Sequence, residues 1–298
     1  MKTISPRDLT QPDFHRLLIG SVGPRPIAFA STVDAAGNVN LSPFSFFNVF
    51  GSNPPTLVFA PNNNRFGHKK HSLMNVEEVP EVVINLVDYA MVEQMSLSSA
   101  DYDRGVNEFV KAGFAAVASE RVRPPRVAES PVAFECVVND IIRIGEGPGA
   151  ASLVVCEVVL AHVREAILDE RGHIDPRRID LVGRMGGEFY ARAHGDALFE
   201  VARPQKGIGV DQLPAHVRTS AILSGNDLGK LGAVTALPTP DEVRQYGQSG
   251  VLNALFDEAR HGCQHLPDLL HHRAKTLLAT SQVAEAWLVL LQPEAVTE

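Results

Sequence analysis

PRPIAFASTVDAAGNVNLSPFSFFN, the stretch from Pro24 to Asn48, predicts a β-hairpin followed by a polar-aromatic loop. Residues 27–32 alternate between two faces with the period of a strand. A turn follows over 34–38, where Gly37 is free to take a positive φ. The return strand begins at Val39. This hairpin is the element around which we expect the rest of the chain to fold.

The loop over 42–48 combines three phenylalanines with serine and asparagine side chains. Its phenyl rings would pack against a core, while hydroxyls, an amide and backbone N–H groups would face a flat polar ligand. From the pattern alone, the stretch fits either an ordinary hairpin of a β-barrel or such a binding element.

The order of these residues resembles the flavin reductase-like family, the FMN-binding split barrels. The resemblance is carried by Pro24-Arg25-Pro26-Ile27, Ser31-Thr32, Asp34 with Gly37, and the run Asn40–Asn48. It continues through Asn107–Phe114, Glu135-Cys136 and Asp180–Tyr190, and so covers about residues 10–200. It implies a mainly β fold with flanking helices, namely an FMN-binding split β-barrel, to which the sequence adds a C-terminal α-helical extension.

A basic loop over 61–76, PNNNRFGHKKHSLMNV, concentrates positive charge in a chain whose net charge is −8. Such runs are commonly solvated loops. Following the opening motif, however, the loop is better interpreted as a phosphate clamp, since arginine, lysine and a hydroxyl are natural partners of a phosphate. If it runs into a helix, the N-terminal N–H groups would add to the binding. His71 stands where the family has an acid, and Ser72 where it has a threonine.

The resemblance therefore implies a set of flavin-binding residues and leaves catalytic residues unassigned. Arg25 is interpreted either as a second anchor or as the partner of a structural acid. The full set is Arg25, Ser31, Thr32, Ser45, Phe46, Phe47, Asn48, Arg65, Lys70, Ser72 and Asn75.

Domain organisation is predicted as a split-barrel domain over 1–203 and a helical extension over 204–298, joined by a linker at 202–207. A capping box with proline after Thr239 predicts a helix that continues through the apolar positions of 252–259 to a stop at Gly262. Further helices are expected over 267–280 and 283–291. We interpret this extension as a helical cap or a dimer-packing element.

Two segments resemble ligand sites but do not have the required pattern. The run Gly145–Ala150 lacks the spacing of a dinucleotide loop and is predicted to be a hairpin turn. The histidines between His261 and His272 fit no zinc spacing, and the loop over 168–175 has one histidine with mobile acids. No metal site is therefore predicted.

Composition narrows the class of protein. At 45% hydrophobic and 21% charged, the chain is typical of soluble globular proteins. Its net negative charge disfavours nucleic-acid binding, and no apolar run is long enough to span a membrane. We expect no signal peptide, because a polar stretch follows Met1. Three scattered cysteines, two of them in apolar strand patterns, suggest buried free thiols and a cytoplasmic location.

By resemblance, the protein is expected to be an NAD(P)H-dependent flavin oxidoreductase. It would transfer hydride from a nicotinamide to FMN, with FAD as the alternative flavin, and would form a homodimer. It could supply reduced flavin to a partner monooxygenase. Two alternatives stay open, namely an FMN-binding electron carrier without appreciable NAD(P)H activity and a barrel that serves mainly as an oligomeric scaffold.

Overall fold

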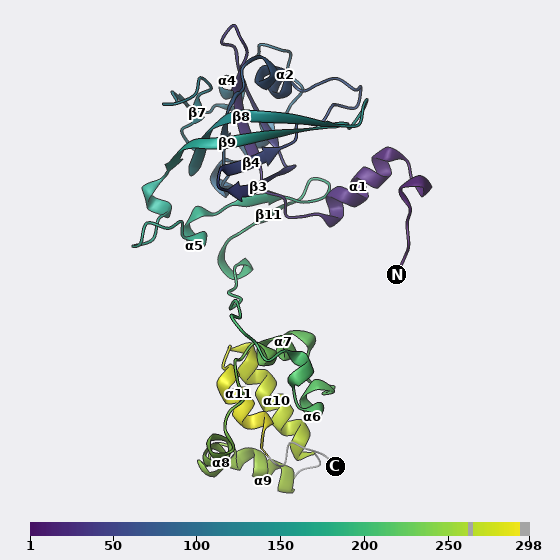
Figure 1. Cartoon of the computed structure of the whole chain (residues 1–298), viewed down its shortest axis with the longest axis vertical. Coiled ribbons are helices and arrows are strands. Elements are labelled where there is room, and N and C mark those ends of the chain that lie inside the picture. Colours follow the sequence, from purple (N-terminus) through teal and green to yellow (C-terminus); the bar gives the residue numbers. More distant parts are fainter. Residues whose placement is uncertain (262–264, 293–298) are drawn as a thin grey trace. The chain divides into compact units, whose positions relative to one another are not determined.

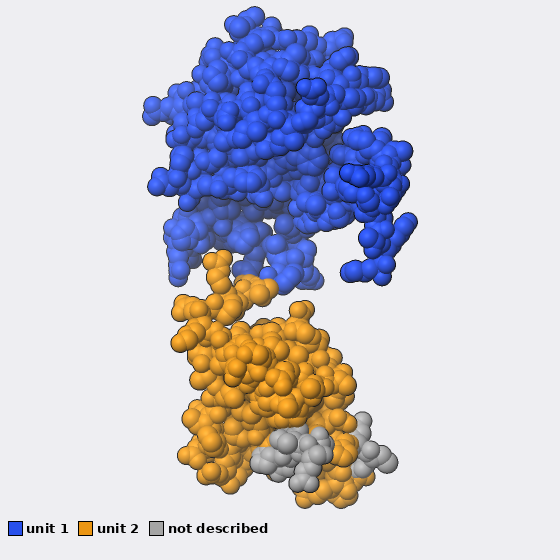
Figure 2. Space-filling view, turned by 45° about the vertical axis from the view of Figure 1, so that its right-hand side comes forward, with its two compact units in different colours: residues 1–199 blue, residues 200–298 orange. Residues whose placement is uncertain are grey.

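The computed structural model of the protein describes residues 1–261 and 265–292. The chain forms two compact units, Met1–Phe199 and Glu200–Glu298, which are drawn in Figure 1 and coloured separately in Figure 2. The predicted domain boundary after Arg203 lies in the irregular segment that opens the second unit.

The first unit is built on a seven-stranded sheet with the order β2-β1-β5-β8-β9-β4-β3. Each neighbouring pair in this order is antiparallel. The strands are β1 (Ala28–Val33), β2 (Val39–Phe44), β3 (Phe47–Ser52), β4 (Pro55–Phe59), β5 (Glu81–Asn85), β8 (Val132–Ile144) and β9 (Ala151–Val163). Short pairs are formed by β6 (Ala116–Val117) with β7 (Arg126–Val127), and by β10 (Val182–Arg184) with β11 (Tyr190–Arg192).

Five helices accompany this sheet. They are α1 (Gln11–Ser21), α2 (His71–Glu78), α3 (Val92–Leu97), α4 (Glu108–Ala112) and α5 (Pro176–Ile179). Short 3₁₀ turns lie at Pro6–Asp8, Tyr89–Met91, Glu165–Ile167, Gly195–Ala197 and, in the second unit, Val210–Gln212. The family's mainly β fold with flanking helices is thereby confirmed.

Strand β1 is buried on both faces, which explains the alternation seen in the sequence. Ala28 and Ala30 pack in one core cluster with residues of α2, whereas Phe29 packs in another with residues of α3 and α4. The two-faced burial explains why small and large residues alternate in β1, since alanines leave room for α2 and Phe29 fills the opposite layer.

The opening motif folds partly as predicted. The hairpin β1–β2 pairs Val33 with Val39 around a turn in which Gly37 has φ 88°. The expected loop over 42–48, however, is mostly strand, because β2 extends to Phe44 and β3 begins at Phe47. Only Ser45 and Phe46 lie between them. Extended backbone here allows Phe44 and Phe47 to reach the core beside β4.

The second unit is a bundle of helices around its own core. Its helices are α6 (Ala215–Arg218), α7 (Gly225–Gly232), α8 (Pro240–Gln248), α9 (Asn253–His261), α10 (Leu266–Ala279) and α11 (Val283–Leu290). Trp287 is almost fully buried there, and its indole N–H donates to the carbonyl of Leu231 at 3.2 Å.

The capping box predicted at Thr239 is present, with Glu242 closing it at the start of α8. The single helix predicted after it was wrong, because the chain breaks between α8 and α9, where Gly250 has φ 86°. The predicted stop at Gly262 and the central part of the 261–265 histidine motif lie outside the described residues. Among the described residues, no helix is long and apolar enough to cross a membrane.

Candidate functional site

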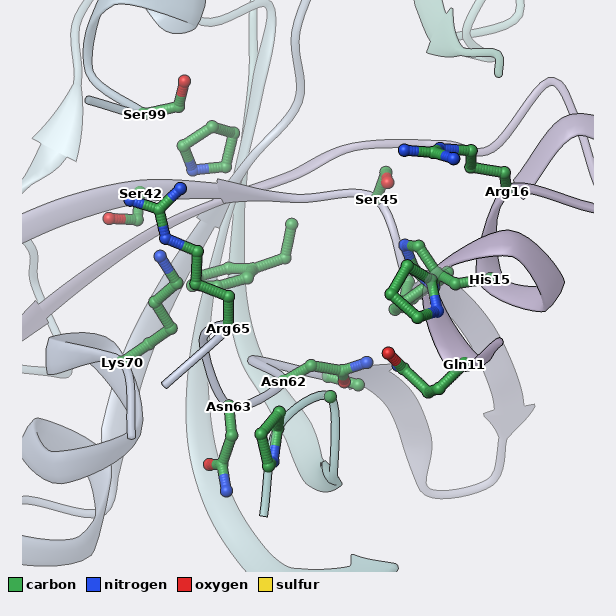
Figure 3. Close-up of a pocket in the computed structure, with 17 residues that line it drawn as sticks. Gln11, His15, Arg16, Ser42, Ser45, Asn62, Asn63, Arg65, Lys70 and Ser99 are labelled. Carbon is green, nitrogen blue, oxygen red and sulfur yellow. The ribbon is translucent and has the colours of Figure 1, made fainter. Parts of the chain in front are cut away.

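A pocket of about 600 Å³ opens beside the turn between β2 and β3 (Figure 3). Its walls come from α1, the β2–β3 turn, the basic loop after β4, and the turn between β8 and β9. The side chains that carry polar or aromatic groups into it are Gln11, His15, Arg16, Ser42, Phe44, Ser45, Phe46, Asn62, Asn63, Arg65, Lys70 and Ser99.

The pocket is cationic although the chain is acidic. Arg16, Arg65 and Lys70 line it, and no lining residue among those described is a carboxylate. Figure 3 shows Arg65 and Lys70 near Ser42 on one side, with His15 and Arg16 on the other. A pocket that lacks acidic side chains while holding several cations is suited to an anionic ligand.

The basic loop presents Arg65 through local hydrogen bonds. The Asn64 carboxamide accepts from the backbone N–H groups of Phe66 and His68, and Gly67 takes φ 83° in this turn. The Arg65 guanidinium lies 4.8 Å from the centre of the Phe66 ring. No carboxylate pairs with Arg65 among the described residues, and Lys70 has only a solvent-exposed Asp101 at 3.6 Å. Both cations are therefore available to a ligand.

Lys70 is also the N-cap residue of α2, and no side chain caps this helix. The first N–H groups of a helix have no partner within it, so they bind anions when left uncapped. The neighbouring His71 has its pKa lowered by burial and by the charges of Arg104 and Lys70, so the start of the helix does not rely on a histidine charge.

On the floor of the pocket, Ser45 is held by Arg25. The Arg25 Nε donates to the Ser45 hydroxyl oxygen at 3.3 Å, and its terminal nitrogens donate to the carbonyls of Ile19, Val22 and Met185. Arg25 is buried and does not line the pocket. Neither interpretation of Arg25 fits this geometry, because its partners are neutral carbonyls and a hydroxyl rather than an acid or a ligand-facing space.

We expect Arg25→Lys to weaken FMN and riboflavin by the same factor, about tenfold. Lysine keeps the charge but cannot reproduce a planar fork that reaches four acceptors. The Ser45 turn and the end of α1 would then lose their common support, whatever ligand is bound. Fluorescence titration with the two flavins measures this, and a loss confined to FMN would contradict a purely supporting role.

Four further residues of the predicted set are buried in the framework and do not line the pocket. The Ser72 hydroxyl donates to Asn40, whose amide donates to Glu108 at 2.6 Å, and the Asn75 amide donates to Thr32. The Ser31 hydroxyl is buried without a partner among the described residues.

Glu108 completes this chain by accepting from the Leu41 N–H, and its burial raises the pKa of the carboxyl group. The chain ties the start of α2 to β2 and α4. Ser72 and Asn75 thus fix the helix that carries the clamp, whereas the sequence had suggested direct contact with phosphate.

Of the predicted residues, the structure brings Ser45, Phe46, Arg65 and Lys70 together around one pocket. Phe47 instead packs against the core cluster beneath the sheet, and Asn48 is exposed on β3. Sequence reasoning missed the α1 wall, because no motif in this segment points to a ligand, and none of the residues of α1 is buried.

Comparison with known proteins shows which family the chain belongs to. The sequence model described as "Flavin reductase like domain" matches residues 21–178, more than half of the chain. The chain belongs to the flavin reductase-like family.

Three relatives show the extent of the match. An uncharacterized protein, BH2278, of Halalkalibacterium halodurans is 36% identical over 203 residues, which are 67% of this chain and 96% of that protein. The 2-nitrobenzoate 2-nitroreductase NbaA of Pseudomonas fluorescens is 30% identical with a TM-score of 0.62, over 72% of this chain and 99% of that one. Component B of nitrilotriacetate monooxygenase from Bacillus cereus has the same identity and TM-score over 68% and 98% of the two chains.

These relatives are aligned almost completely while covering only two thirds to three quarters of this chain. Most of the helical second unit therefore has no counterpart in these three proteins.

Proposed function

We propose that this flavin reductase-like protein is an NAD(P)H-dependent flavin oxidoreductase that binds FMN in the cationic pocket. The observation that carries the proposal is that the basic loop and the turn between β2 and β3 line the same pocket. Arg65 and Lys70 form one wall, and the Ser45–Phe46 turn forms part of the floor.

The residues present fit FMN. The volume of about 600 Å³ lies in the range of cofactor pockets. Arg65, Lys70 and the uncapped N–H groups of α2 would hold the phosphate. The hydroxyl of Ser45 and the neighbouring backbone would face the polar edge of the ring system, while Phe44 and Phe46 supply apolar surface. FAD is the alternative flavin, since the pocket is open.

When bound, the isoalloxazine supplies the hydride chemistry, and the protein supplies binding, orientation and electrostatics. Because Arg25 donates to the Ser45 oxygen, the Ser45 hydroxyl proton is left to donate to a ligand. Positive groups preorganised around the pocket favour the negative charge that a reduced flavin acquires. On one side of the pocket, Gln11 and His15 of α1 would restrict the directions from which a nicotinamide can approach the flavin.

The destination of the electrons is suggested by the relatives. One relative is named as a component of a monooxygenase and another as a nitroreductase. We propose that this protein passes reduced flavin to a partner monooxygenase. The electron-carrier alternative shares the pocket and differs only in lacking reaction with NAD(P)H.

A homodimer is part of the proposal. Strand β3 lies at the edge of the sheet, and Val49 and Phe50 on it are 65% and 69% exposed. Exposed apolar side chains on an edge strand are typical of a surface that a second chain covers. The free thiols of Cys136 and Cys156 are buried, which agrees with the reducing cytoplasm that we propose as its location.

Anaerobic stopped-flow mixing of the FMN-loaded protein with NADH or NADPH tests this function. We expect rapid loss of the visible flavin absorbance. A flavin that dithionite reduces but neither nucleotide does would favour the electron carrier. A colourless protein that ignores added FMN would favour the scaffold.

A further inference from the structure

Two smaller cavities continue the flavin pocket along the first unit. A cavity of about 190 Å³ shares Pro43, Ser45 and Ser99 with the flavin pocket. It shares Ser96, Arg184 and Tyr190 with a second cavity of about 450 Å³. The shared lining residues make these spaces neighbours of one another and of the flavin pocket. We call the cavity of about 450 Å³ the arginine groove; its lining includes Tyr89, Glu93, Arg184, Glu188, Tyr190 and Arg192.

Arg184, which lies where the two smaller cavities meet, is a cation without an acidic partner among the described residues. Its guanidinium lies 4.5 Å from the centre of the Tyr190 ring, and one terminal nitrogen donates to the Gly187 carbonyl at 2.6 Å. Burial and the positive charge of Arg184 lower the pKa of Arg25, which also has no acidic partner. An anion beside Arg184 would relieve this repulsion.

Arg192, at the outer end, is fixed differently. It makes two hydrogen bonds of 2.7 Å to Asp180, and its guanidinium lies 3.8 Å from the centre of the half-exposed Tyr89 ring. Its charge is therefore already neutralised, and what remains is a flat stacked surface. Guanidinium and aromatic faces of this kind are platforms for a nucleobase.

Glu93 and Glu188 also line the groove, and both are exposed without a cationic partner among the described residues. Carboxylates accept hydrogen bonds from ribose hydroxyls and repel a phosphate placed on them.

We propose that the arginine groove binds the ADP half of NADH while the nicotinamide lies in the flavin pocket. Arg184 would hold the pyrophosphate, and the Tyr89–Arg192 pair would support the adenine. Glu93 and Glu188 would accept from the ribose and disfavour the 2′-phosphate of NADPH. This inference rests on the proposed function and adds a nucleotide preference to it.

The test compares NADH with 1-benzyl-1,4-dihydronicotinamide, a hydride donor that has no ADP, on FMN-loaded protein. Arg184→Ala is expected to raise the KM for NADH by a factor about ten times the factor by which it raises the KM for the benzyl compound. The FMN dissociation constant checks that the variant is folded. Arg171→Ala removes one positive charge from an exposed loop outside the groove and is expected to change neither KM.

Glu93→Gln combined with Glu188→Gln supplies a second readout. The ratio of kcat/KM for NADPH to that for NADH should rise about tenfold, since the repulsion of the 2′-phosphate is removed.

Two outcomes would overturn the inference alone. One is that Arg184→Ala raises the KM for NADH and the KM for the benzyl compound by the same factor. The other is that Arg184→Ala leaves the KM for NADH unchanged; if it then weakens FAD binding but not FMN binding, the groove would be assigned to the ADP of FAD. If neither donor reduces the wild-type flavin, the proposed function and this inference fall together.

Discussion

Replacing both Arg65 and Lys70 by alanine is expected to weaken FMN binding about a hundredfold, while riboflavin binding changes little. Both side chains line one wall of the pocket, and neither is held by a close, buried carboxylate. FMN and riboflavin differ only in the phosphate, so the difference between their affinities isolates the clamp. Titration of the apoprotein with each flavin, followed by flavin fluorescence, measures both constants.

The matched control is Lys69→Ala. Lys69 neighbours Lys70 in the chain, but its amine pairs with Glu77 at 2.7 Å and it does not line the pocket. Removing it takes away one positive charge next to the clamp, against two in the double variant, without touching the clamp itself. An equal loss of both flavins in the double variant, or a comparable loss of FMN in the control, would refute the assignment.

Leu270→Ala is expected to destabilise the helical unit by about 2–5 kcal/mol and to leave the barrel unit unaffected. Leu270 in α10 is fully buried in a core cluster drawn entirely from the second unit. Truncation removes apolar contacts and leaves a cavity that the surrounding helices fill incompletely. The chain has one tryptophan, and Trp287 lies in that same core, so its fluorescence reports unfolding of this unit alone.

Release of bound FMN in the same denaturant series reports the barrel unit. We expect the tryptophan midpoint to fall and the flavin midpoint to stay. Leu237→Ala, at a position 38% exposed, is the control and should move neither. Coincident shifts of both midpoints would show that the units unfold as one, contrary to the two separate cores.

Sequence reasoning succeeded where a local signal acts alone. The alternation in β1 and the Thr239–Glu242 capping box each follow from the chemistry of a few neighbouring residues. The family resemblance was confirmed, because a long ordered motif is far more specific to one family than a short one.

What failed depends on packing between distant segments. Nothing local shows that the Ser72 hydroxyl turns inward to Asn40, because Asn40 is placed by the sheet and Glu108 by a later helix. Arg25 likewise finds its acceptors at Ile19 and Met185, which are far apart in the chain. The wall formed by α1 was missed because the sequence of this segment alone does not show which distant segments the helix faces.

That wall has an energetic consequence. Helix α1 buries none of its residues, and Arg25 grips the carbonyls of its Ile19 and of Val22 just beyond it. The N-terminal end of α1, which carries Gln11 and His15, is therefore held by few contacts. Unwinding this end costs far less free energy than separating two strands of the sheet. Local opening of this one helix, rather than of the barrel, should therefore set the rate at which a bound flavin exchanges with solution.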